Sequence, residues 1–505
     1  MKKLSLTVFA VVCVFSSCAL AWSQAALPSP TLIYSTAAPL AIPNGSPWNG
    51  PAPCTASTPC YRIPLETPAI TGGSTLVMMF GYDSTSNNQV FSVTDDKSNS
   101  WVLDVVSSAS NSKVVRMYRA ANVAAGTSYV NIQLTSGSQN GFWQPLIAEF
   151  YNVGAIDGSS CFANNSATVQ AGNITPTVSG DLILQAKYSA NQTSQTASFT
   201  AGSQPNISWS LASQLLGDGA ADQYGVYNST ATLNPQFGQA SADAYISCAV
   251  ALKAASAGSA PTAIPRIVHQ EHDAMPRGAL NPWTLGMIAT QPGAIYISAM
   301  ENDPITSLTS SATPDLGWAK SGPDHVGTNG HNNTYIYCAQ FYKPPGPFTI
   351  SVTRSVNTND SIFMVYEVIG GTCTVDADFP YDGVQQSATS AMTICSGCLT
   401  PTKPNDFILA NEGQGNCTVT SLVSPTGGIL DSAWFSGNTI DGPTQTDENN
   451  GWMHYYNGSS LSPITVTLGE SCASGEGYWA GRVAAYQSVS TGAPQPPTGL
   501  SAIVH

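Results

Sequence analysis

The feature that most constrains this chain is an internal repeat, because two copies of one unit must share one architecture. Three segments of the first half recur in the same order in the second half: residues 147–154 recur at 364–371, 180–184 at 405–409, and 249–253 at 482–486. The offset grows from 218 residues, taken between Glu149 and Glu367 in the first match, to 233 residues in the last, as expected if loops changed length while strands did not. Each unit then spans roughly 220 residues, the size of one large sandwich.

Within each unit, the chain has the pattern of short strands rather than helices. Few windows place apolar residues at helical spacing, whereas runs of β-branched and aromatic residues alternate with clusters of Gly, Asn, Asp and Ser. Four such runs are 75–80, 113–118, 129–134 and 145–150. The pattern predicts an all-β chain made of two antiparallel, jelly-roll-like β-sandwich domains in tandem.

Composition changes at both ends of the chain and at its middle. Residues 1–25 begin with two lysines, an apolar run and small residues, the pattern of a signal peptide. Residues 256–264 form an uncharged linker of small residues and Pro, so module 1 is predicted over 26–255 and module 2 over 265–489. The tail, 490–505, is rich in Pro and Gly and resembles the lead-in to a fibronectin type III domain.

The export signal allows two outcomes. Either it is removed and the protein is secreted, or residues 14–18 act as a lipobox and Cys18 is lipidated and anchors the chain. The apolar run is too short to cross a bilayer, so we expect no membrane span. The formal net charge is −14 and no basic cluster occurs, which argues against nucleic acid as a partner.

The cysteines fit an exported protein. Twelve occur in the chain, and the even number left after the signal predicts disulfides whose pairing the sequence does not fix. Two candidate positions stand out: Cys54 and Cys60 bracket a short loop, and Cys395 and Cys398 form a C-x-x-C, with a disulfide made locally or to Cys373 and Cys417. Most of the remaining cysteines lie from Cys248 onward, which predicts a more heavily cross-linked second module.

Two acidic and aromatic segments precede the last strands of the repeats, and they are expected to be loops. The candidate ligand-binding residues are Asp218, Asp222 and Tyr224 in the first, and Asp441, Asp447, Glu448, Asn450, Trp452 and His454 in the second. Aromatic faces and amides suit an extracellular glycan. Calcium is the cation that such oxygen-rich loops would hold, although neither has EF-hand spacing. The competing interpretation is a polar turn followed by a Tyr-rich strand.

Catalytic signals are weak. Glu149 and Glu367 occupy equivalent strands, where a buried carboxyl could act as a general acid. One carboxylate per repeat instead favours a structural role, in which the Glu marks a strand end and either points outward or is bound by the backbone or a Tyr. All six histidines lie at or beyond 269, and three of them could hold zinc. His269 and His272 would point to opposite faces of a strand, so surface and loop positions are expected instead. No nucleotide-binding or nucleophile motif occurs, and no catalytic residue is assigned.

Three segments together carry a resemblance to a known class of modules. They are a Ser-Val-Thr-Asp…Asn-Ser-Trp hairpin at 92–101, Glu-Phe-Tyr-Asn-Val-Gly at 149–154, and Gly-Asp-Leu-Ile-Leu at 180–184. This pattern resembles extracellular bacterial β-sandwich modules found beside fibronectin III or immunoglobulin-like domains in surface proteins. The resemblance implies architecture and an extracellular location, not a reaction.

These observations predict a secreted or cell-surface binding or structural protein. Its partners would be an extracellular glycan or other surface proteins. One alternative is a secreted polysaccharide-acting hydrolase that uses acidic or histidine residues of module 2. Another is an adhesion or filament subunit.

Overall fold

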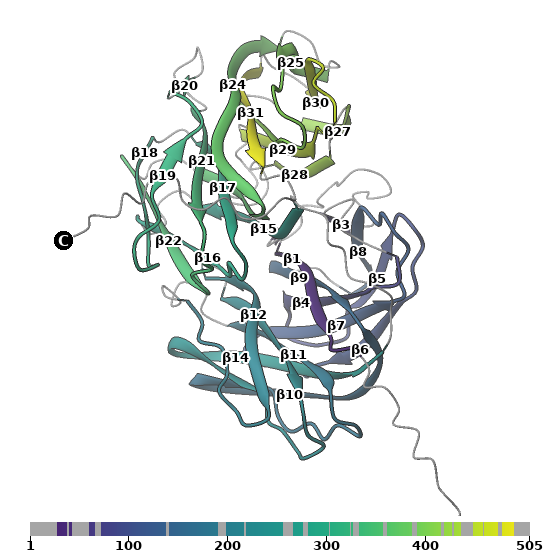
Figure 1. The fold of residues 1–505 in the computed structure, drawn as a ribbon. Helices are drawn as coiled ribbons and strands as arrows, with labels where there is room; N and C mark the ends of the chain where they lie inside the picture. The colour runs from purple at the N-terminus through teal and green to yellow at the C-terminus, as the bar shows by residue number, and fades with distance from the viewer. Residues whose placement is uncertain are drawn as a thin grey trace, which may run out of the picture.

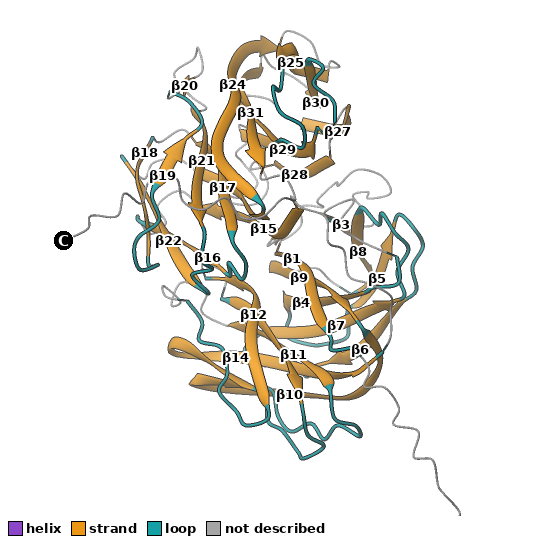
Figure 2. Ribbon diagram, viewed as in Figure 1, coloured by secondary structure: helices purple, strands orange, loops and turns teal. Residues whose placement is uncertain are grey.

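The structure, a computed structural model, consists of strands, with no helix among the residues that it describes (Figure 2). It describes residues 28–37, 40–42, 60–65, 72–137, 141–189, 198–216, 219–255, 266–275, 281–301, 304–323, 325–326, 333–356, 361–385, 391–415, 419–426, 429–435, 448–457, 459–472 and 477–488. The all-β prediction is confirmed. Within these ranges, no helix is long and apolar enough to cross a membrane.

One twelve-stranded sheet runs through both halves of the chain (Figure 1). From edge to edge, its main path contains β19 (Trp318–Lys320), β21 (Asn333–Phe341), β17 (Gly293–Glu301), β23 (Ser361–Ile369), β15 (Arg266–Met275), β1 (Thr31–Ala37), β9 (Gly141–Tyr151), β4 (Thr75–Asp83), β7 (Lys113–Ala121) and β6 (Trp101–Val106). Two short strands extend it: β2 (Leu40–Ile42) pairs with β9, and β20 (His325–Val326) with β21.

Smaller sheets cover this central sheet. The first half has a five-stranded sheet, β10 (Val153–Gln170), β14 (Gln236–Ala254), β11 (Asp181–Ser189), β13 (Ala220–Tyr227) and β12 (Ile207–Leu215), and a three-stranded sheet, β3 (Cys60–Pro64), β8 (Tyr129–Ser136) and β5 (Val90–Asp95). The second half has the counterparts β24 (Gly371–Gln385), β31 (Gly477–Ser488), β26 (Phe407–Gly415), β29 (Glu448–Tyr456) and β28 (Ile429–Phe435), and β16 (Trp283–Met287), β22 (Phe348–Arg354) and β18 (Ile305–Ser310). A further sheet, β25 (Ala391–Leu399), β30 (Ile464–Cys472) and β27 (Val419–Thr426), occurs only in the second half of the described chain.

The two halves therefore have the same strand order, and we refer to residues 28–255 and 266–488 as the first and second repeat. Four expected strand runs fall in β4, β7, β8 and β9. One predicted match is out of register by one residue: Leu184 pairs with Val250 and Leu409 with Ala484, so Val250 corresponds to Ala484 and not to Val483. A slip of one residue would turn every side chain of the strand to the opposite face, and runs of Ala and Val do not reveal it.

The repeats are joined through a parallel pair of strands, whereas two separate antiparallel sandwiches were expected. Ser35 of β1 lies opposite His269 of β15, and Ala37 lies opposite Glu271. Each of the two strands then continues outward into its own repeat by antiparallel pairing, β1 with β9 and β15 with β23. Figure 1 shows this junction between the two lobes.

The strands β1 and β15 are parallel neighbours and occupy equivalent places in the two repeats. An approximate two-fold axis that runs along the strands therefore relates the repeats. A rotation about this axis exchanges the two faces of the sheet. On one face, a single core joins the three-stranded sheet of the first repeat, with Ile63 and Ile132, to the five-stranded sheet of the second, with Phe407 and Tyr486. The opposite face carries the reverse arrangement, with separate cores under β11 and β14 and under β16 and β22. Both repeats thus depend on one shared sheet.

Residues 92–101 do not form the expected hairpin. β5 pairs with β8 in a three-stranded sheet, whereas β6 pairs with β7 in the central sheet. Asp95 holds the crossing between them, because its carboxylate accepts hydrogen bonds from the backbone N–H groups of Lys97 (2.9 Å) and Asn99 (3.1 Å) and from the indole N–H of Trp101 (2.7 Å). The spacing of Asp95 and Trp101 therefore marks a corner between sheets.

We expect the two repeats to unfold together, because they share a sheet and a core. A protease site inserted within 256–264 should allow cleavage into two fragments that still elute as one species on size exclusion. Separation of the same sample on a denaturing gel is the control that cleavage occurred. Two independently eluting fragments, or two resolved calorimetric transitions for the intact chain, would contradict the shared core.

Candidate functional site

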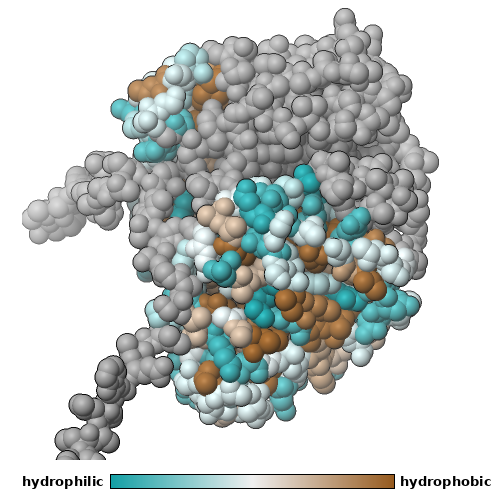
Figure 3. All heavy atoms as spheres, turned by 90° about the vertical axis from the view of Figure 1, so that its right-hand side faces the viewer, coloured by the Kyte–Doolittle hydropathy of each residue, from teal (hydrophilic) through white to brown (hydrophobic). Residues whose placement is uncertain are grey.

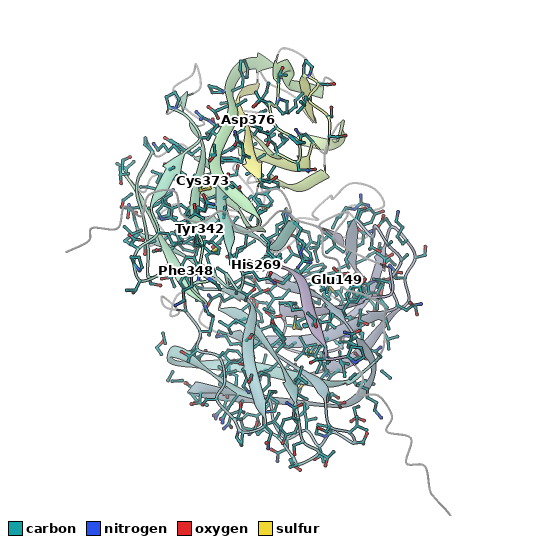
Figure 4. All side chains as sticks on the ribbon, in the orientation of Figure 1. Glu149, His269, Tyr342, Phe348, Cys373 and Asp376 are labelled. Carbon is teal, nitrogen blue, oxygen red and sulfur yellow. A yellow bond between two sulfur atoms is a disulfide. The ribbon has the colours of Figure 1, made fainter. Side chains whose placement is uncertain are left out.

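The junction of the repeats buries a polar cluster on one face of the central sheet. The hydroxyl of Ser35 donates to the carbonyl of Ala212 in β12 (2.7 Å) and lies 2.7 Å from Nδ1 of His269. His269 is 0% exposed, and Figure 4 shows it where the two lobes meet. These contacts join β1, β12 and β15, so the cluster connects both repeats.

The hydrogen bonds fix the state of the His269 ring. Because the single hydroxyl proton of Ser35 goes to a carbonyl, the serine oxygen must accept a hydrogen from Nδ1 of His269. The other ring nitrogen, Nε2, is then unprotonated, and it lies 3.7 Å from Oε2 of Glu271. Burial lowers the pKa of His269 to about 3, so the ring is neutral. A serine that donates to a carbonyl inside the protein is not placed to act as a nucleophile.

The opposite face of the junction carries the counterpart of this contact. Tyr34 donates its hydroxyl to the side-chain carbonyl of Gln270 at 3.1 Å. Tyr34 lies opposite Glu149 as His269 lies opposite Glu367. Tyr34 therefore corresponds to His269, and Gln270 corresponds to Ser35. The same contact between the two strands is made by Tyr and Gln on one face of the sheet and by His and Ser on the other.

A second bridge lies on the face that carries His269. The amide of Gln214 in β12 donates to the carbonyl of Met287 in β16 (2.7 Å). A side chain at Gly286 would place its Cβ 2.6 Å from Cγ of Gln214, so a glycine is required for this close approach. The five-stranded sheet of one repeat is thereby held against the three-stranded sheet of the other.

Glu149 and Glu367 are buried inside the protein. Their exposed fractions are 0% and 1%, so the expectation of a residue pointing outward is wrong, and the expectation of a backbone-bound carboxyl is confirmed for Glu367. Its Oε1 accepts the backbone N–H of Ile288 (2.7 Å), just after β16. Burial raises the pKa of Glu367 to about 7 even though backbone N–H groups of Ile288 and Ala289 lower it. The side chain attaches the three-stranded sheet to β23.

The structure corrects the first of the two segments expected to be loops. Residues 220–227 form β13, and Asp222 is 0% exposed while Tyr224 is half-buried against Phe150 (ring centroids 5.4 Å apart). Burial raises the pKa of Asp222 to about 8. Neither residue is placed to bind an external ligand, because the alternation of β13 turns both side chains toward the central sheet. Asp218 lies outside the described residues.

The second acidic and aromatic segment corresponds to the first. Trp452 pairs with Asn411, and His454 with Leu409, in the places where Asp222 and Tyr224 pair with Ala186 and Leu184. Glu448 and Asn450 lie on the same strand, β29. Asp441 and Asp447 lie outside the described residues. The predicted segments are thus equivalent strands rather than loops where the structure describes them.

The histidines do not form a described metal site. No group of three or more His, Cys, Asp or Glu that could hold a metal ion occurs among the described residues. His269, expected on the surface or in a loop, is instead buried in β15. His272 and His454 lie in strands, as does His325, and His331 lies outside the described residues.

Two disulfides lie within the described chain, one in each repeat. Cys161 of β10 bonds Cys248 of β14, and Cys338 of β21 bonds Cys373 of β24. The alternative that paired Cys373 with the C-x-x-C is therefore wrong. Cys54 and Cys417 lie outside the described residues, while Cys60, Cys395 and Cys398 lie in strands whose cysteine pairing stays a prediction.

A repeated pair of aspartates was missed from the sequence. Asp157 of β10 contacts Asp181 of β11, and Asp376 of β24 contacts Asp406, which precedes β26. The recurring Pro-Thr-x-x-Gly/Asn-Asp at 176–181 and 401–406 was the available signal. The other two aspartates lie in long strands without a recurring motif, so the pairing was not visible.

Comparison with protein-family models, with characterised proteins and with solved structures finds no match.

Glu367→Gln should change the pH dependence of stability. The folded state holds the Glu367 proton up to a pKa of about 7, so this carboxyl contributes stability at low pH that is lost as pH rises from its unfolded value toward 7. The glutamine keeps the acceptor for Ile288 without ionising. Urea unfolding should show the variant gaining about 3 kcal/mol on the wild type between pH 4 and pH 8; parallel profiles would contradict the assignment.

Ser35→Ala should destabilise the junction. The change leaves the ring N–H of His269 and the carbonyl of Ala212 without this partner in a buried site, at a cost of about 1–3 kcal/mol. Ser159, which is exposed on β10, offers the matched control, and Ser159→Ala should change the unfolding free energy by less than about 0.5 kcal/mol. Equal effects of the two substitutions in urea unfolding would rule out the role of Ser35.

Proposed function

We propose that this chain is a secreted or cell-surface structural and binding protein whose ligand is an extracellular polysaccharide. The observation that carries the proposal is the shared sheet. The polar groups at its junction form hydrogen bonds from one strand to another: Ser35 with His269, Tyr34 with Gln270, and Gln214 with Met287. Such a junction suits a rigid scaffold. The resemblance to extracellular bacterial β-sandwich modules and the two disulfides agree with it.

The surface of the described chain mixes polar and apolar residues, which suits contact with a polar ligand such as a polysaccharide. Figure 3 shows hydrophobic and hydrophilic residues intermingled on the described part of one face. The exposed large hydrophobic residues come from several different elements and include Val102, Phe162 and Tyr342. Low overall charge, 9% of residues, favours recognition through hydrogen bonds and aromatic faces over ion pairing.

The second repeat is the better candidate for sugar contact. Tyr342, in the connection between β21 and β22, is 70% exposed, and an exposed tyrosine ring can cover the apolar face of a sugar. Tyr342 belongs to the second repeat.

Binding to insoluble polysaccharides tests the proposal. Cellulose, chitin, xylan and peptidoglycan are incubated with the protein in calcium and in chelator, and the bound fraction is measured. Retention on at least one polymer is expected, with a loss of about tenfold for Tyr342→Ala, because a contact that contributes about 1.4 kcal/mol changes the dissociation constant tenfold.

Phe162→Ala supplies the matched control, since Phe162 is an exposed aromatic residue of the first repeat. It should bind as the wild type does. Retention that falls equally in both variants would contradict a site in the second repeat. No retention on any polymer would remove polysaccharide from the proposal.

A further inference from the structure

In each repeat, a buried carboxyl group receives no hydrogen bond from the part of the chain that the structure describes. Asp181 and Asp406 are both 0% exposed. Neither oxygen of either carboxyl receives a hydrogen bond from the described residues. A buried ionised carboxylate with no donor is strongly unfavourable, so the same unfavourable arrangement at two equivalent places needs a physical explanation.

The group that each of these carboxyls does contact is a second aspartate. In the first repeat, the carboxylate of Asp157 accepts the hydroxyl of Thr177 (2.6 Å), the backbone N–H of Thr177 and the ammonium of Lys253 (3.1 Å). It also meets the carboxyl of Asp181. Donors therefore surround Asp157 on one side, and Asp181 lies on the other.

The second repeat reproduces this arrangement. Asp376 accepts the hydroxyl and backbone N–H of Thr402 and the side-chain amide of Gln487 (3.3 Å), and it meets Asp406. Gln487 takes the place of Lys253 at the end of the equivalent strand.

The local backbone sets the geometry of both pairs. The residue before the buried aspartate has a positive φ in each repeat, 94° at Gly180 and 61° at Asn405. Glycine and asparagine are the residues that adopt this conformation most readily. The turn that begins at the threonine thus brings the threonine donors to one aspartate and starts the strand with the other.

Two ionised carboxylates in contact repel each other, whereas a carboxylic acid donates a strong hydrogen bond to a carboxylate. We propose that each repeat binds one proton between its two aspartates, so that Asp181 and Asp406 are carboxylic acids that donate to the carboxylates of Asp157 and Asp376. The proton supplies the one donor that the described side chains do not.

The electrostatic surroundings agree with this assignment. Burial, and then the neighbouring Asp157, raise the pKa of Asp181 to about 7, and burial and Asp376 do the same for Asp406. Burial also acts to raise the pKa of Asp157 and of Asp376, but the threonine donors hold both below the usual value.

The charged and titratable groups facing the pairs are few. Lys253 of β14 faces the first pair and lowers the pKa of Asp181, and Lys403 of the preceding turn does so for Asp406. The hydroxyl of Tyr296 in β17 also faces Asp406, but it donates to the carbonyl of Thr372 (2.8 Å). Because the folded pKa of each buried aspartate is raised, the proton stabilises the fold at low pH, and this stability is lost as pH rises from about 4 to about 7.

The double variant Asp181→Asn, Asp406→Asn tests the proposal. Each asparagine amide places a permanent N–H donor where the proton would be. Each site contributes about 100-fold between pH 5 and pH 8, so the wild-type folding constant should fall on the order of 1,000- to 10,000-fold more than that of the variant, measured by urea unfolding. Asp315→Asn is the matched control, because Asp315 is an exposed carboxylate that already accepts the backbone N–H of Ser310 (2.7 Å), and it should follow the wild-type profile.

A carboxyl NMR titration of the wild-type chain, labelled at aspartate, gives a result that does not depend on the variants. Aspartate carboxyls with midpoints near pH 7 are expected, and two of them should disappear in the double variant. Because Asp222 also has a raised pKa, the decisive signals are those that the double variant loses, and the absence of any aspartate midpoint above pH 6 that disappears in the double variant would overturn the proposal. So would an increase in the wild-type melting temperature with calcium that the double variant lacks, because the pairs would then hold a cation in place of the proton.

Discussion

The parallel pairing of β1 with β15 is the interaction on which the rest of the structure depends. It makes one sheet from two repeats and, because it relates them by a two-fold rotation along the strands, it gives each repeat the opposite face for its smaller sheets. The core on one face then includes residues from both halves of the chain, such as Ile63 and Tyr486. Parallel strands need a long connection, and here that connection is the whole first repeat.

Polar groups define the places where the layers join. Glu367 holds the backbone after β16, Gln214 bridges β12 to β16, and Ser35 links β1 to both β12 and β15. Apolar packing between sheets has little directional preference, whereas a buried hydrogen bond that is not made costs about 1–3 kcal/mol. These groups therefore fix how the sheets sit on one another, and the apolar cores supply most of the driving force.

Much of the fold follows from local sequence pattern. The alternation of apolar residues predicted β4, β7, β8 and β9, and the recurrence of Glu149 at Glu367 identified equivalent strands. The junction could not be predicted from the sequence. His269 is one of several histidines in a polar segment, and its role is visible only when β1 lies beside it. The one-residue register error at Val250 has the same cause: pairing partners lie far apart in the chain, and short runs of Ala and Val fit two registers.

The candidate site residues could be predicted only in part, because the sequence does not show which way a side chain points. Asp222 and Tyr224 resemble a ligand loop in sequence, since acidic, glycine and aromatic residues cluster there, but strand β13 carries both toward the central sheet. The aspartate pairs show the reverse case. Asp181 and Asp406 lie in a recurring motif, yet their partners Asp157 and Asp376 lie in strands that share no visible pattern.

The two-fold relation at the junction has a consequence for how this protein can vary. In an assembly of two identical chains, both faces of such a contact would be built from the same pair of side chains, and any substitution would be felt twice. Here one face uses Tyr34 with Gln270 and the other uses Ser35 with His269. Because both repeats belong to one polypeptide, the two contacts are encoded by different residues. A substitution can therefore change the contact on one face of the sheet and leave the contact on the other face as it was.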